Sequence, residues 1–247
     1  HMPPHKTYLE PFFGSGAVFF NKAPSPLETI NDLDGDVVNL FKVIRDRPEE
    51  LARAVYWTPY SRQEYNESYD MTGADDLERA RRFLVRCWMA RGGTSDRTGW
   101  KHNIDVDRAP NNRMPDQWSA VPERIMAITS RLKAVQIENQ PALQLIERYK
   151  APSVLIYADP PYPLDTRSGR MYRYEMTDED HAELLEVLDA HPGPVLLSGY
   201  DNQLYNERLK HWHRVERQAL AEAGRIRTEV LWLNPIAAEH QKQLTLF

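Results

Sequence analysis

Residues 154–162 read Val-Leu-Ile-Tyr-Ala-Asp-Pro-Pro-Tyr, a short unbroken apolar run followed by a carboxylate, two prolines and a tyrosine. The apolar run 154–158 is typical of a strand that is buried on both faces of a parallel sheet. Asp159 follows at the carboxyl end of this strand, and ligands bind at that edge in open α/β sheets. The stretch therefore predicts a parallel α/β sheet with a binding site at its carboxyl edge.

The Asp-Pro-Pro-Tyr quartet has the chemistry to hold a planar amino group. Pro160 and Pro161 fix their own φ angles and lack N–H groups, so the turn is stiff and offers carbonyl oxygens without competing donors. Tyr162 adds a flat aromatic face on which a base can stack. Asp and Pro are also common in ordinary turns, so the alternative is a plain turn at the end of a strand. The buried strand in front of the quartet favours the binding site.

Strands and helices alternate on both sides of this stretch. Residues 7–21 follow the order strand, glycine loop, helix, and residues 27–45 repeat the order of strand and helix. Two consecutive βα units imply a parallel sheet. Four further strands are predicted at 135–138, 195–198, 212–217 and 228–233. With the two strands of the βα units and the strand 154–158, we expect seven strands, with an antiparallel edge at the end of the chain.

Between about residues 48 and 134 the pattern changes to helices without convincing strands. Residues 77–91 form the clearest helical pattern, and residues 92–118 are polar and rich in Gly, Pro, Asn and Arg. A loop of that length inside a compact domain is usually functional or disordered. We therefore expect a helical lobe at 48–134, inserted into a domain made of residues 3–47 and 135–247.

The composition of the 247 residues excludes several classes of protein. The formal net charge is -5, so the chain as a whole is not built as a general polyanion binder. The single cysteine, Cys87, excludes an internal disulfide and any multi-cysteine zinc site, which agrees with a reducing compartment. No apolar run approaches the roughly 18 residues of a membrane span. These features predict a soluble cytoplasmic protein without a metal site.

Positive charge is concentrated in one region. From Arg79 to Lys101 there are seven Arg or Lys residues and one acid, Asp96, which gives a local balance of +6. A solvated helix face explains part of this run, and a nucleic-acid surface is the alternative.

The glycine loop and the acid after the second strand predict a nucleoside ligand. The loop Phe13-Gly14-Ser15-Gly16 lets the backbone approach a ligand and presents amide donors at a helix N-terminus. It lacks the spacing of the NAD fingerprint and the Lys-Ser/Thr ending of a phosphate loop. Asp32 lies 16 residues after Gly16, where an acid commonly accepts hydrogen bonds from ribose hydroxyls. Asp32 could instead cap the helix that follows it.

The chain resembles the Dam-like DNA adenine methyltransferases, S-adenosylmethionine-dependent enzymes that methylate the exocyclic amine of adenine. The matching segments span nearly the whole sequence in the family's order: 10–16 (Glu-Pro-Phe-Phe-Gly-Ser-Gly), 31–32 (Asn-Asp), 159–162, 198–200 (Ser-Gly-Tyr) and 229–235 (Glu-Val-Leu-Trp-Leu-Asn-Pro). The resemblance implies a Rossmann-like seven-stranded methyltransferase sheet, with an inserted helical target-recognition lobe. It also implies double-stranded DNA as the partner, in a restriction-modification or phage context.

The resemblance also implies a set of residues that hold S-adenosylmethionine. By position these are Phe12, Phe13, Gly14 and Gly16 around the cofactor, Glu10 near its methionine end and Asp32 at its ribose. Two features depart from the family pattern. The chain begins downstream of the Pro-Gly-Gly-Lys segment that usually helps to hold the cofactor. Members of the family often have an Asp after the third strand, which accepts a hydrogen bond from the adenine amine of the cofactor. This position is Pro141 here, and Gln140 is expected to substitute for the Asp.

The resemblance implies that Asp159 and Pro160 bind the target amine and that Tyr162 stacks on the extruded base. The lone pair of adenine's amino group is delocalised into the ring, so the nitrogen is a poor nucleophile until hydrogen bonds from its two N–H groups draw it toward tetrahedral geometry. The Asp159 carboxylate and the Pro160 carbonyl can supply these two acceptors. The methyl donor is a sulfonium with a neutral leaving group, so in-line positioning can supply much of the catalysis.

Basic and aromatic residues of the lobe, and one arginine after the quartet, are expected to contact DNA. They are Arg91, Arg97, Trp100, Lys101, Arg113 and Arg167, and for Arg167 a solvated loop is an equal alternative.

Two other functions stay open at this point. The missing upstream segment would suit a catalytically silent DNA-binding or accessory subunit, and RNA could replace DNA as the substrate. Methylation of a protein amide is disfavoured, since proteins that methylate glutamine usually have Asn at the position of Asp159.

Overall fold

The computed structural model describes residues 2–92, 97–104, 113–167, 172–220 and 226–244. Contacts within the chain divide it into two compact units. The first unit contains His1–Leu33, Gln136–Arg170 and Tyr174–Phe247, and the second contains Asp34–Val135 and Met171–Arg173. Each unit has its own secondary-structure class, so the two are described separately.

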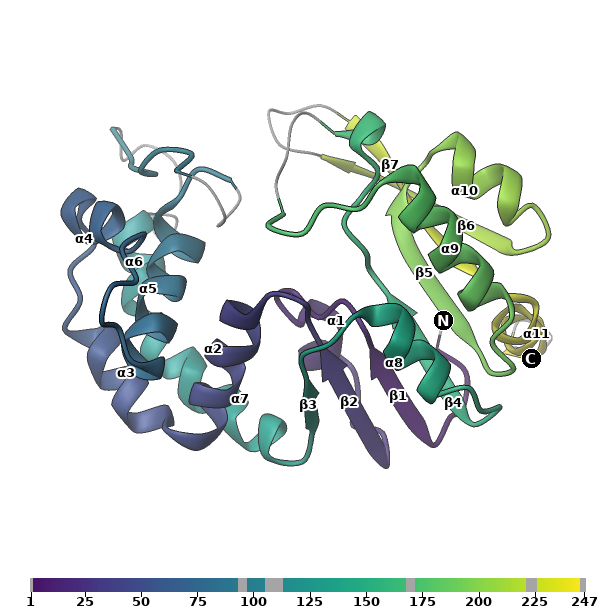
Figure 1. The fold of residues 1–247 in the computed structure, drawn as a ribbon, viewed down its shortest axis with the longest axis horizontal. Coiled ribbons are helices and arrows are strands. Elements are labelled where there is room, and N and C mark those ends of the chain that lie inside the picture. The colour runs from purple at the N-terminus through teal and green to yellow at the C-terminus, as the bar shows by residue number, and fades with distance from the viewer. Residues whose placement is uncertain (1, 93–96, 105–112, 168–171, 221–225, 245–247) are drawn as a thin grey trace. The chain divides into compact units, whose positions relative to one another are not determined.

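The first unit is built on a single seven-stranded sheet with the strand order β3-β2-β1-β4-β5-β7-β6. The strands are β1 (Thr7–Glu10), β2 (Leu27–Asn31), β3 (Gln136–Glu138), β4 (Val154–Ala158), β5 (Val195–Tyr200), β6 (His213–Leu220) and β7 (Ile226–Leu233). The first five strands pair in parallel, whereas β7 runs antiparallel to both β5 and β6. This arrangement confirms the Rossmann-like seven-stranded sheet predicted from the sequence (Figure 1).

Strand β4 lies at the centre of the sheet and pairs with β1 on one side and β5 on the other. Its side chains are buried or half-buried along its whole length, which agrees with the unbroken apolar run of its sequence. The chain runs outward from β1 to β3 in one direction and from β4 to β5 in the other. The order therefore reverses between β1 and β4, and such a switch point is where doubly wound sheets bind ligands.

Helices complete the first unit. They are α1 (Ala17–Asn21), α8 (Ala142–Arg148), the 3-10 turn η1 (Leu164–Thr166), α9 (Asp178–Asp189), α10 (Gln203–Arg208) and α11 (Pro235–Leu244). Helices α8 and α9 lie side by side over the sheet (Figure 1), and α11 packs against β5 and β7. Thr177 and Asp180 form a capping box at the start of α9, which satisfies two donors of its first turn.

The core of the first unit forms where β4 and β5 meet these helices. Ile156 and Leu197 of the two strands are fully buried, and Leu184 of α9 packs against them. Tyr205 and Trp232 extend the same cluster, with ring centroids 5.2 Å apart and planes at 64°. Because both faces around β4 are covered, the position of the residue that follows it is fixed by packing rather than by the loop alone.

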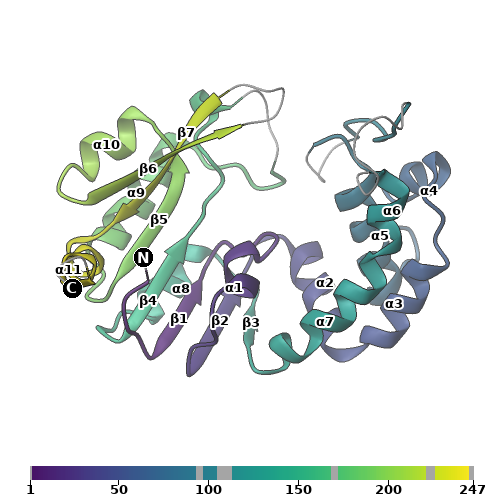
Figure 2. The same cartoon turned by 180° about the vertical axis from the view of Figure 1, so that it is seen from behind.

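The described residues of the second unit form helices and one antiparallel bridge, between Ala90 and Trp100. Its helices are α2 (Gly35–Asp46), α3 (Pro48–Tyr56), α4 (Arg62–Glu67), α5 (Asp76–Met89), α6 (Met114–Ser119) and α7 (Val121–Lys133), which are seen from two sides in Figures 1 and 2. Helix α2 packs against α5 and α7, and α3 packs against α7. Side chains of Asp34, Ser61 and Asp75 cap three of the helices by accepting backbone N–H groups.

The contacts place two segments differently from the expected boundaries. Helix α2 was expected to belong with residues 3–47, yet its apolar face packs within the helical unit, which starts at Asp34. The polar segment 92–118 also ends in a helix, α6, rather than in a loop. Trp118 on α6 is buried and donates its indole N–H to the Thr58 carbonyl oxygen at 2.7 Å.

Among the described residues, the structure contains no helix that is both long and apolar enough to cross a membrane.

Candidate active site

The glycine loop between β1 and α1 is a tight turn that needs glycine at its end. The Gly16 N–H donates to the Phe13 carbonyl oxygen at 2.7 Å, and the φ angles of Gly14 and Gly16 are +48° and +66°. A Cβ atom on Gly16 would lie 2.5 Å from Cζ of Phe13, whereas a Cβ on Gly14 would meet nothing within 4 Å. Gly16 therefore allows the close turn, and Gly14 leaves open space beside the backbone.

The two phenylalanines of the loop have different environments. Phe13 is 4% exposed and makes edge-on ring contacts with Phe19 and Phe20 of α1, with centroids 5.6 and 6.0 Å apart. Phe12 is half-buried and packs against the core cluster beneath the sheet edge. Phe13 thus supports the loop from below, and its expected border with a ligand stays a prediction, as does that of Phe12.

Asp32 is linked directly to the glycine loop. Its Oδ2 atom accepts the Gly14 N–H at 2.8 Å, and the Phe13 N–H donates to the Asn31 carbonyl oxygen at 2.9 Å. Asp32 is half-buried. The helix-capping alternative does not hold, since it is Asp34 that caps α2 through a hydrogen bond from the Asp36 N–H.

Asn31 joins three strand ends at the same edge of the sheet. Its Nδ2 donates to the carbonyl oxygens of Pro11 and Gln140, and its Oδ1 accepts the Gln140 N–H. The side-chain oxygen of Gln140 accepts from Arg148 at 3.0 Å. Asn31 thus fixes Gln140 beside the loops that follow β1 and β2. The sequence predicts no role for Asn31 beyond its place in the Asn-Asp motif.

Glu10 ends β1 as a buried carboxyl. It is 2% exposed, and its Oε2 accepts the Tyr8 hydroxyl at 2.6 Å. Burial raises the pKa of Glu10 to about 8; the hydrogen bond from Tyr8 lowers the pKa, and the nearby Asp159 carboxylate raises it. A cationic group placed beside this buried carboxyl would favour its ionised form.

Asp159 emerges at the carboxyl end of β4, across the switch point from the glycine loop. Its Oδ1 accepts the Ser198 hydroxyl at 2.7 Å. The residue reaches solvent, yet nearby protein atoms displace part of the water around its carboxylate and thereby raise the pKa of Asp159. Hydrogen bonds from Ser198 and Tyr162 lower this pKa, and the Glu229 carboxylate raises it. Glu10 ends β1 and Asp159 follows the neighbouring parallel strand β4, so the two carboxyls lie at one edge of the sheet.

Tyr162 of the quartet lies against a second aromatic ring. Pro160 is buried and Tyr162 is half-buried. The Tyr162 ring meets Tyr200 of β5 edge to face, with centroids 4.6 Å apart and planes at 68°. Tyr200 therefore adds a second aromatic ring beside the one that the sequence predicted. The sequence predicts no role for Tyr200 beyond its place in the Ser-Gly-Tyr motif.

The second unit carries a cluster of cations around Trp100. The Arg62 guanidinium lies 4.8 Å from the Trp100 ring centroid, and the His102 ring stacks on Trp100 at 5.1 Å with planes 9° apart. Arg91 is exposed and donates to the Trp100 carbonyl oxygen and toward the His102 ring. Lys101 is also exposed. Trp100 therefore organises neighbouring cations and does not present a bare ring for stacking.

Much of the basic run from Arg79 to Lys101 is used inside the second unit. Arg79 and Arg86 pair with Asp36, Arg81 pairs with Glu64 and Glu78, and Arg82 pairs with Glu78. The exposed cations of this run are Arg91, Arg97 and Lys101, while Arg113, outside it, pairs with Asp116 at 2.6 Å. Arg97 also donates to the Asn66 carbonyl oxygen at 3.0 Å. The local balance of +6 thus overstates the charge available to a polyanion.

Arg167 has a structural partner instead of an open surface. Its side chain is 4% exposed, it forms an ion pair with Glu175, and its Nε donates to the Tyr162 carbonyl oxygen at 2.8 Å. The expectation that Arg167 contacts DNA is therefore corrected, because its guanidinium is enclosed. It braces the segment that follows the Asp-Pro-Pro-Tyr quartet.

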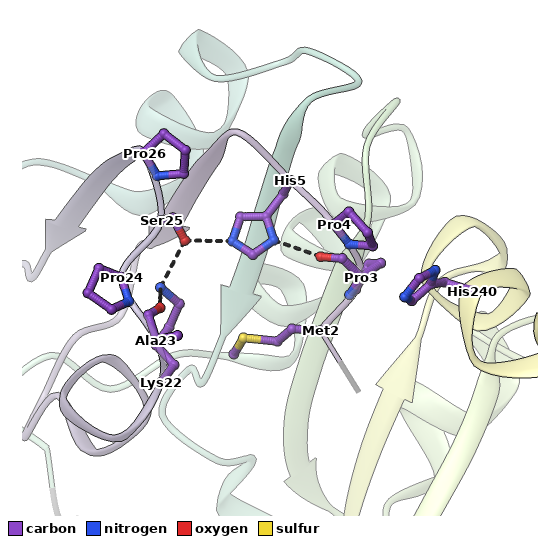
Figure 3. A pocket seen from close by; sticks show the side chains of 10 residues that line it. All are labelled: Met2, Pro3, Pro4, His5, Lys22, Ala23, Pro24, Ser25, Pro26 and His240. Carbon is purple, nitrogen blue, oxygen red and sulfur yellow. Dashed lines mark hydrogen bonds between the residues drawn. The ribbon is translucent and has the colours of Figure 1, made fainter. Parts of the chain in front are cut away.

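A pocket of about 600 Å³ lies at the opposite edge of the sheet, before β1 and β2 (Figure 3). His5 faces it with both ring nitrogens engaged, by the Pro3 carbonyl oxygen and the Ser25 hydroxyl, and Lys22 donates to Ser25 and pairs with Glu28. The carboxyl edge with Glu10 and Asp159 is a different site.

Comparisons with known proteins agree with this geometry. The sequence profile of the D12 class N6 adenine-specific DNA methyltransferase family matches residues 1–222. Type II methyltransferase M1.LlaDCHI of Lactococcus lactis subsp. cremoris is 27% identical over 230 residues, which cover 85% of this chain and 78% of that protein. DNA adenine methylase of Salmonella typhi is 26% identical over 262 residues, covering 93% and 86%. DNA adenine methylase of Escherichia coli (strain K12) is 23% identical over 249 residues, covering 91% and 84%.

Proposed function

Because this chain belongs to the D12 class N6 adenine-specific DNA methyltransferase family, we propose that it transfers a methyl group from S-adenosylmethionine to the N6 amine of adenine in double-stranded DNA. In this proposal the Asp159 carboxylate accepts a hydrogen bond from the target amine. The observation that carries the assignment is the position of Asp159. It ends the central strand β4 at the switch point, beside the glycine loop and the buried Glu10. The family and the names of its members favour DNA adenine methylation over a silent accessory subunit or an RNA substrate.

Asp159 and Pro160 have the chemistry that an exocyclic amine requires. The carboxylate accepts one N–H of the amine and the Pro160 carbonyl oxygen accepts the other, which restores nucleophilic character to the nitrogen. The Asp159 side chain reaches solvent, so its carboxylate is accessible to an incoming amine. Tyr162 and Tyr200 supply aromatic surface against which the base can lie, which offsets part of the unstacking cost of a few kcal/mol.

The carboxyl edge of the sheet fits S-adenosylmethionine. When bound, the cofactor supplies an electrophilic methyl carbon on a cationic sulfur. Gly14 and Gly16 would let it approach the backbone, with Phe12 beside the loop and Phe13 beneath it. Glu10 would face a positive charge of the cofactor, Asp32 its ribose and Gln140 its adenine. The buried carboxyl of Glu10 supports this fit, since a cation would favour its ionised form.

The helical unit is proposed to recognise the target sequence. Exposed Arg91, Arg97, Lys101 and Arg113 would hold phosphates, and Trp100 would keep Arg91 and His102 in place for contact with bases or backbone. The boundaries that we propose for this unit are those of its packing, from Asp34 to Val135.

Transfer of a labelled methyl group from S-adenosylmethionine tests the proposal. The intact protein is incubated with duplex DNA, single-stranded DNA and RNA, and the modified nucleoside is identified by mass spectrometry. We expect N6-methyladenine in duplex DNA. Product in RNA alone, or no cofactor binding by titration, would contradict the proposal and favour one of the two rival functions.

A further inference from the structure

Asp159 is the last member of a line of hydrogen bonds that starts at the half-buried Tyr157. The Tyr157 hydroxyl donates to Oγ of Ser198 at 3.1 Å, and the Ser198 hydroxyl donates to Oδ1 of Asp159 at 2.7 Å. Strands β4 and β5 pair with Ala158 opposite Leu197. The next residues along the two strands, Asp159 and Ser198, therefore lie beside each other. The contact is therefore set by the sheet.

Ser198 has one hydroxyl hydrogen and two acceptors within reach. The second acceptor is the Ala158 carbonyl oxygen, at 3.3 Å. The Asp159 carboxylate is closer, and a hydrogen bond to a charged oxygen is about twice as strong as one to a neutral oxygen. Donation from Tyr157 occupies a lone pair of the serine oxygen, so the serine hydrogen is directed away from Tyr157 and toward Asp159.

Tyr157 is suited to this role because it stays a donor. Burial raises the pKa of its phenol, and the nearby carboxylates of Asp159 and Glu10 raise it further. The phenol therefore keeps its proton over the whole range in which an enzyme of this kind works. Its ring lies on β4, two residues before Asp159, so the two ends of the line belong to one strand.

The line affects the charge of Asp159 as well as its orientation. Burial raises the pKa of Asp159, and the hydrogen bond from Ser198 opposes this rise. The ionisable groups that face Asp159 are Glu10 from β1, Tyr157 from β4, Tyr162 from the quartet, Glu229 from β7 and Tyr205 from α10. Among these groups, the Glu229 carboxylate favours the protonated form of Asp159. A protonated Asp159 would have lost acceptor capacity that the target amine needs.

We propose that Ser198 is a positioning residue for methyl transfer, which holds the Asp159 carboxylate in the orientation that accepts the target amine, and that Tyr157 fixes the direction of the Ser198 hydroxyl. The inference rests on the proposed function for the identity of the amine. Neither Ser198 nor Tyr157 touches the reacting atoms in this account. Both act through Asp159.

Three variants test the proposal: Ser198→Ala, Ser198→Thr and Tyr157→Phe. Loss of a hydrogen bond to a charged group predicts a fall of about 10-fold to 100-fold in kcat for Ser198→Ala, with the acid limb of the kcat profile moved to higher pH. The cofactor Kd and the KM for DNA should stay near the wild-type values. Ser198→Thr keeps the hydroxyl and should restore kcat and the pH profile. Tyr157→Phe should shift both in the direction of Ser198→Ala, by less.

A second readout separates this inference from the proposed function. The pKa of the Asp159 carboxyl is measured by NMR in the protein without substrates, where turnover plays no part. We expect a higher pKa in Ser198→Ala than in the wild type or in Ser198→Thr. An unchanged pKa, or equal losses of kcat in the Ala and Thr variants, would overturn the positioning role. Absence of methyl transfer by the wild type would overturn the proposed function alone, because the NMR result stands without it.

Discussion

The backbone N–H of Gly14 donates a 2.8 Å hydrogen bond to Oδ2 of Asp32, which joins the loop after β1 to the end of β2. The loop is therefore held in place by the same carboxylate that is proposed to bind the cofactor's ribose. Both strands are parallel neighbours in the sheet, with Glu10 opposite Ile30. The geometry of the cofactor site thus depends on the sheet edge as a whole, and a change in the loop alters the position of Asp32 as well.

Gly16→Ala should weaken cofactor binding and lower stability. The new Cβ would lie 2.5 Å from the Phe13 ring, and the φ angle of +66° is strained for alanine. Strain of this kind costs about 1–3 kcal/mol, and 1.4 kcal/mol corresponds to tenfold in affinity. The Kd for S-adenosylmethionine by calorimetry and the melting temperature measure the two effects.

Gly73→Ala is the matched control for Gly16→Ala. Gly73 has a φ angle of +67° and nothing within 4 Å of its Cβ position, and it lies in the helical unit. Its substitution should lower the melting temperature without changing the cofactor Kd. Equal loss of cofactor affinity in the two variants would show that the glycine loop has no special part in binding.

The buried carboxyl of Glu10 predicts a dependence of cofactor affinity on pH. Its pKa of about 8 means that the free protein keeps it protonated at neutral pH, whereas a cationic ligand favours the carboxylate. Affinity for S-adenosylmethionine should therefore rise with pH up to about 8, with release of a proton, and level off above it. Glu10→Gln should bind more weakly and lose this dependence. Calorimetry in buffers of different ionisation enthalpy counts the proton, and a wild-type value of zero would refute the assignment.

The raised pKa of Glu10 also makes the stability of the folded protein fall as the pH rises. The folded protein holds a proton on Glu10 up to a pKa of about 8, while the unfolded chain releases it near the ordinary pKa of 4.5. Glu10 therefore costs the folded state an increasing free energy as the pH rises from the lower to the higher value. Denaturation at pH 5 and pH 9 should show Glu10→Gln to gain stability relative to the wild type as the pH rises.

Arg167→Ala should destabilise the protein rather than weaken DNA binding. Its guanidinium is 4% exposed and pairs with Glu175, which is 14% exposed. Removing one partner of a buried ion pair costs about 3–5 kcal/mol because the other charge is left uncompensated. Chemical denaturation measures the loss, and Arg167→Ala combined with Glu175→Ala should recover part of it. An unchanged stability with a higher KM for DNA would restore the phosphate contact.

Lys101→Ala should weaken DNA binding in a salt-dependent way. Lys101 is exposed beside the Trp100 cluster, and one lost phosphate contact should reduce the slope of log K against log salt by about 1. Lys133→Ala, on an exposed position at the end of α7, is the charge-matched control. The KM for duplex DNA at several salt concentrations gives both slopes. Identical slopes for the two variants would speak against a specific DNA contact at Lys101.

The sheet was predictable because its strands carry their signal locally. Strand β4 has the limits predicted for it, 154–158, because it is a short apolar run that ends before an acid. Strands β1 and β2 start at the predicted residues 7 and 27. The last two strands are longer than expected. They pair with each other over eight residues, and polar residues such as Gln218 and Arg227 extend the pairing beyond the predicted limits.

The environment of side chains far apart in sequence was less predictable. Arg167 looks like a free cation in the sequence, and only folding brings Glu175 against it. Helix α2 follows β2 directly, so the sequence favoured a single βα domain, but its apolar face packs against α5 and α7. Ser198 could be quoted from a motif, yet its contact with Asp159 depends on the register of β4 and β5. Such long-range pairings leave no periodic pattern in one sequence.

The central claim, that Asp159 accepts the target amine, is tested most directly by single-turnover methyl transfer with Asp159→Asn. The substitution keeps the shape of the side chain but places a neutral amide where the amine needs an acceptor of full negative charge. We predict a loss of at least about 100-fold in the rate of N6-methyladenine formation, with unchanged melting temperature and cofactor Kd. A variant that transfers methyl groups at the wild-type rate would contradict the account.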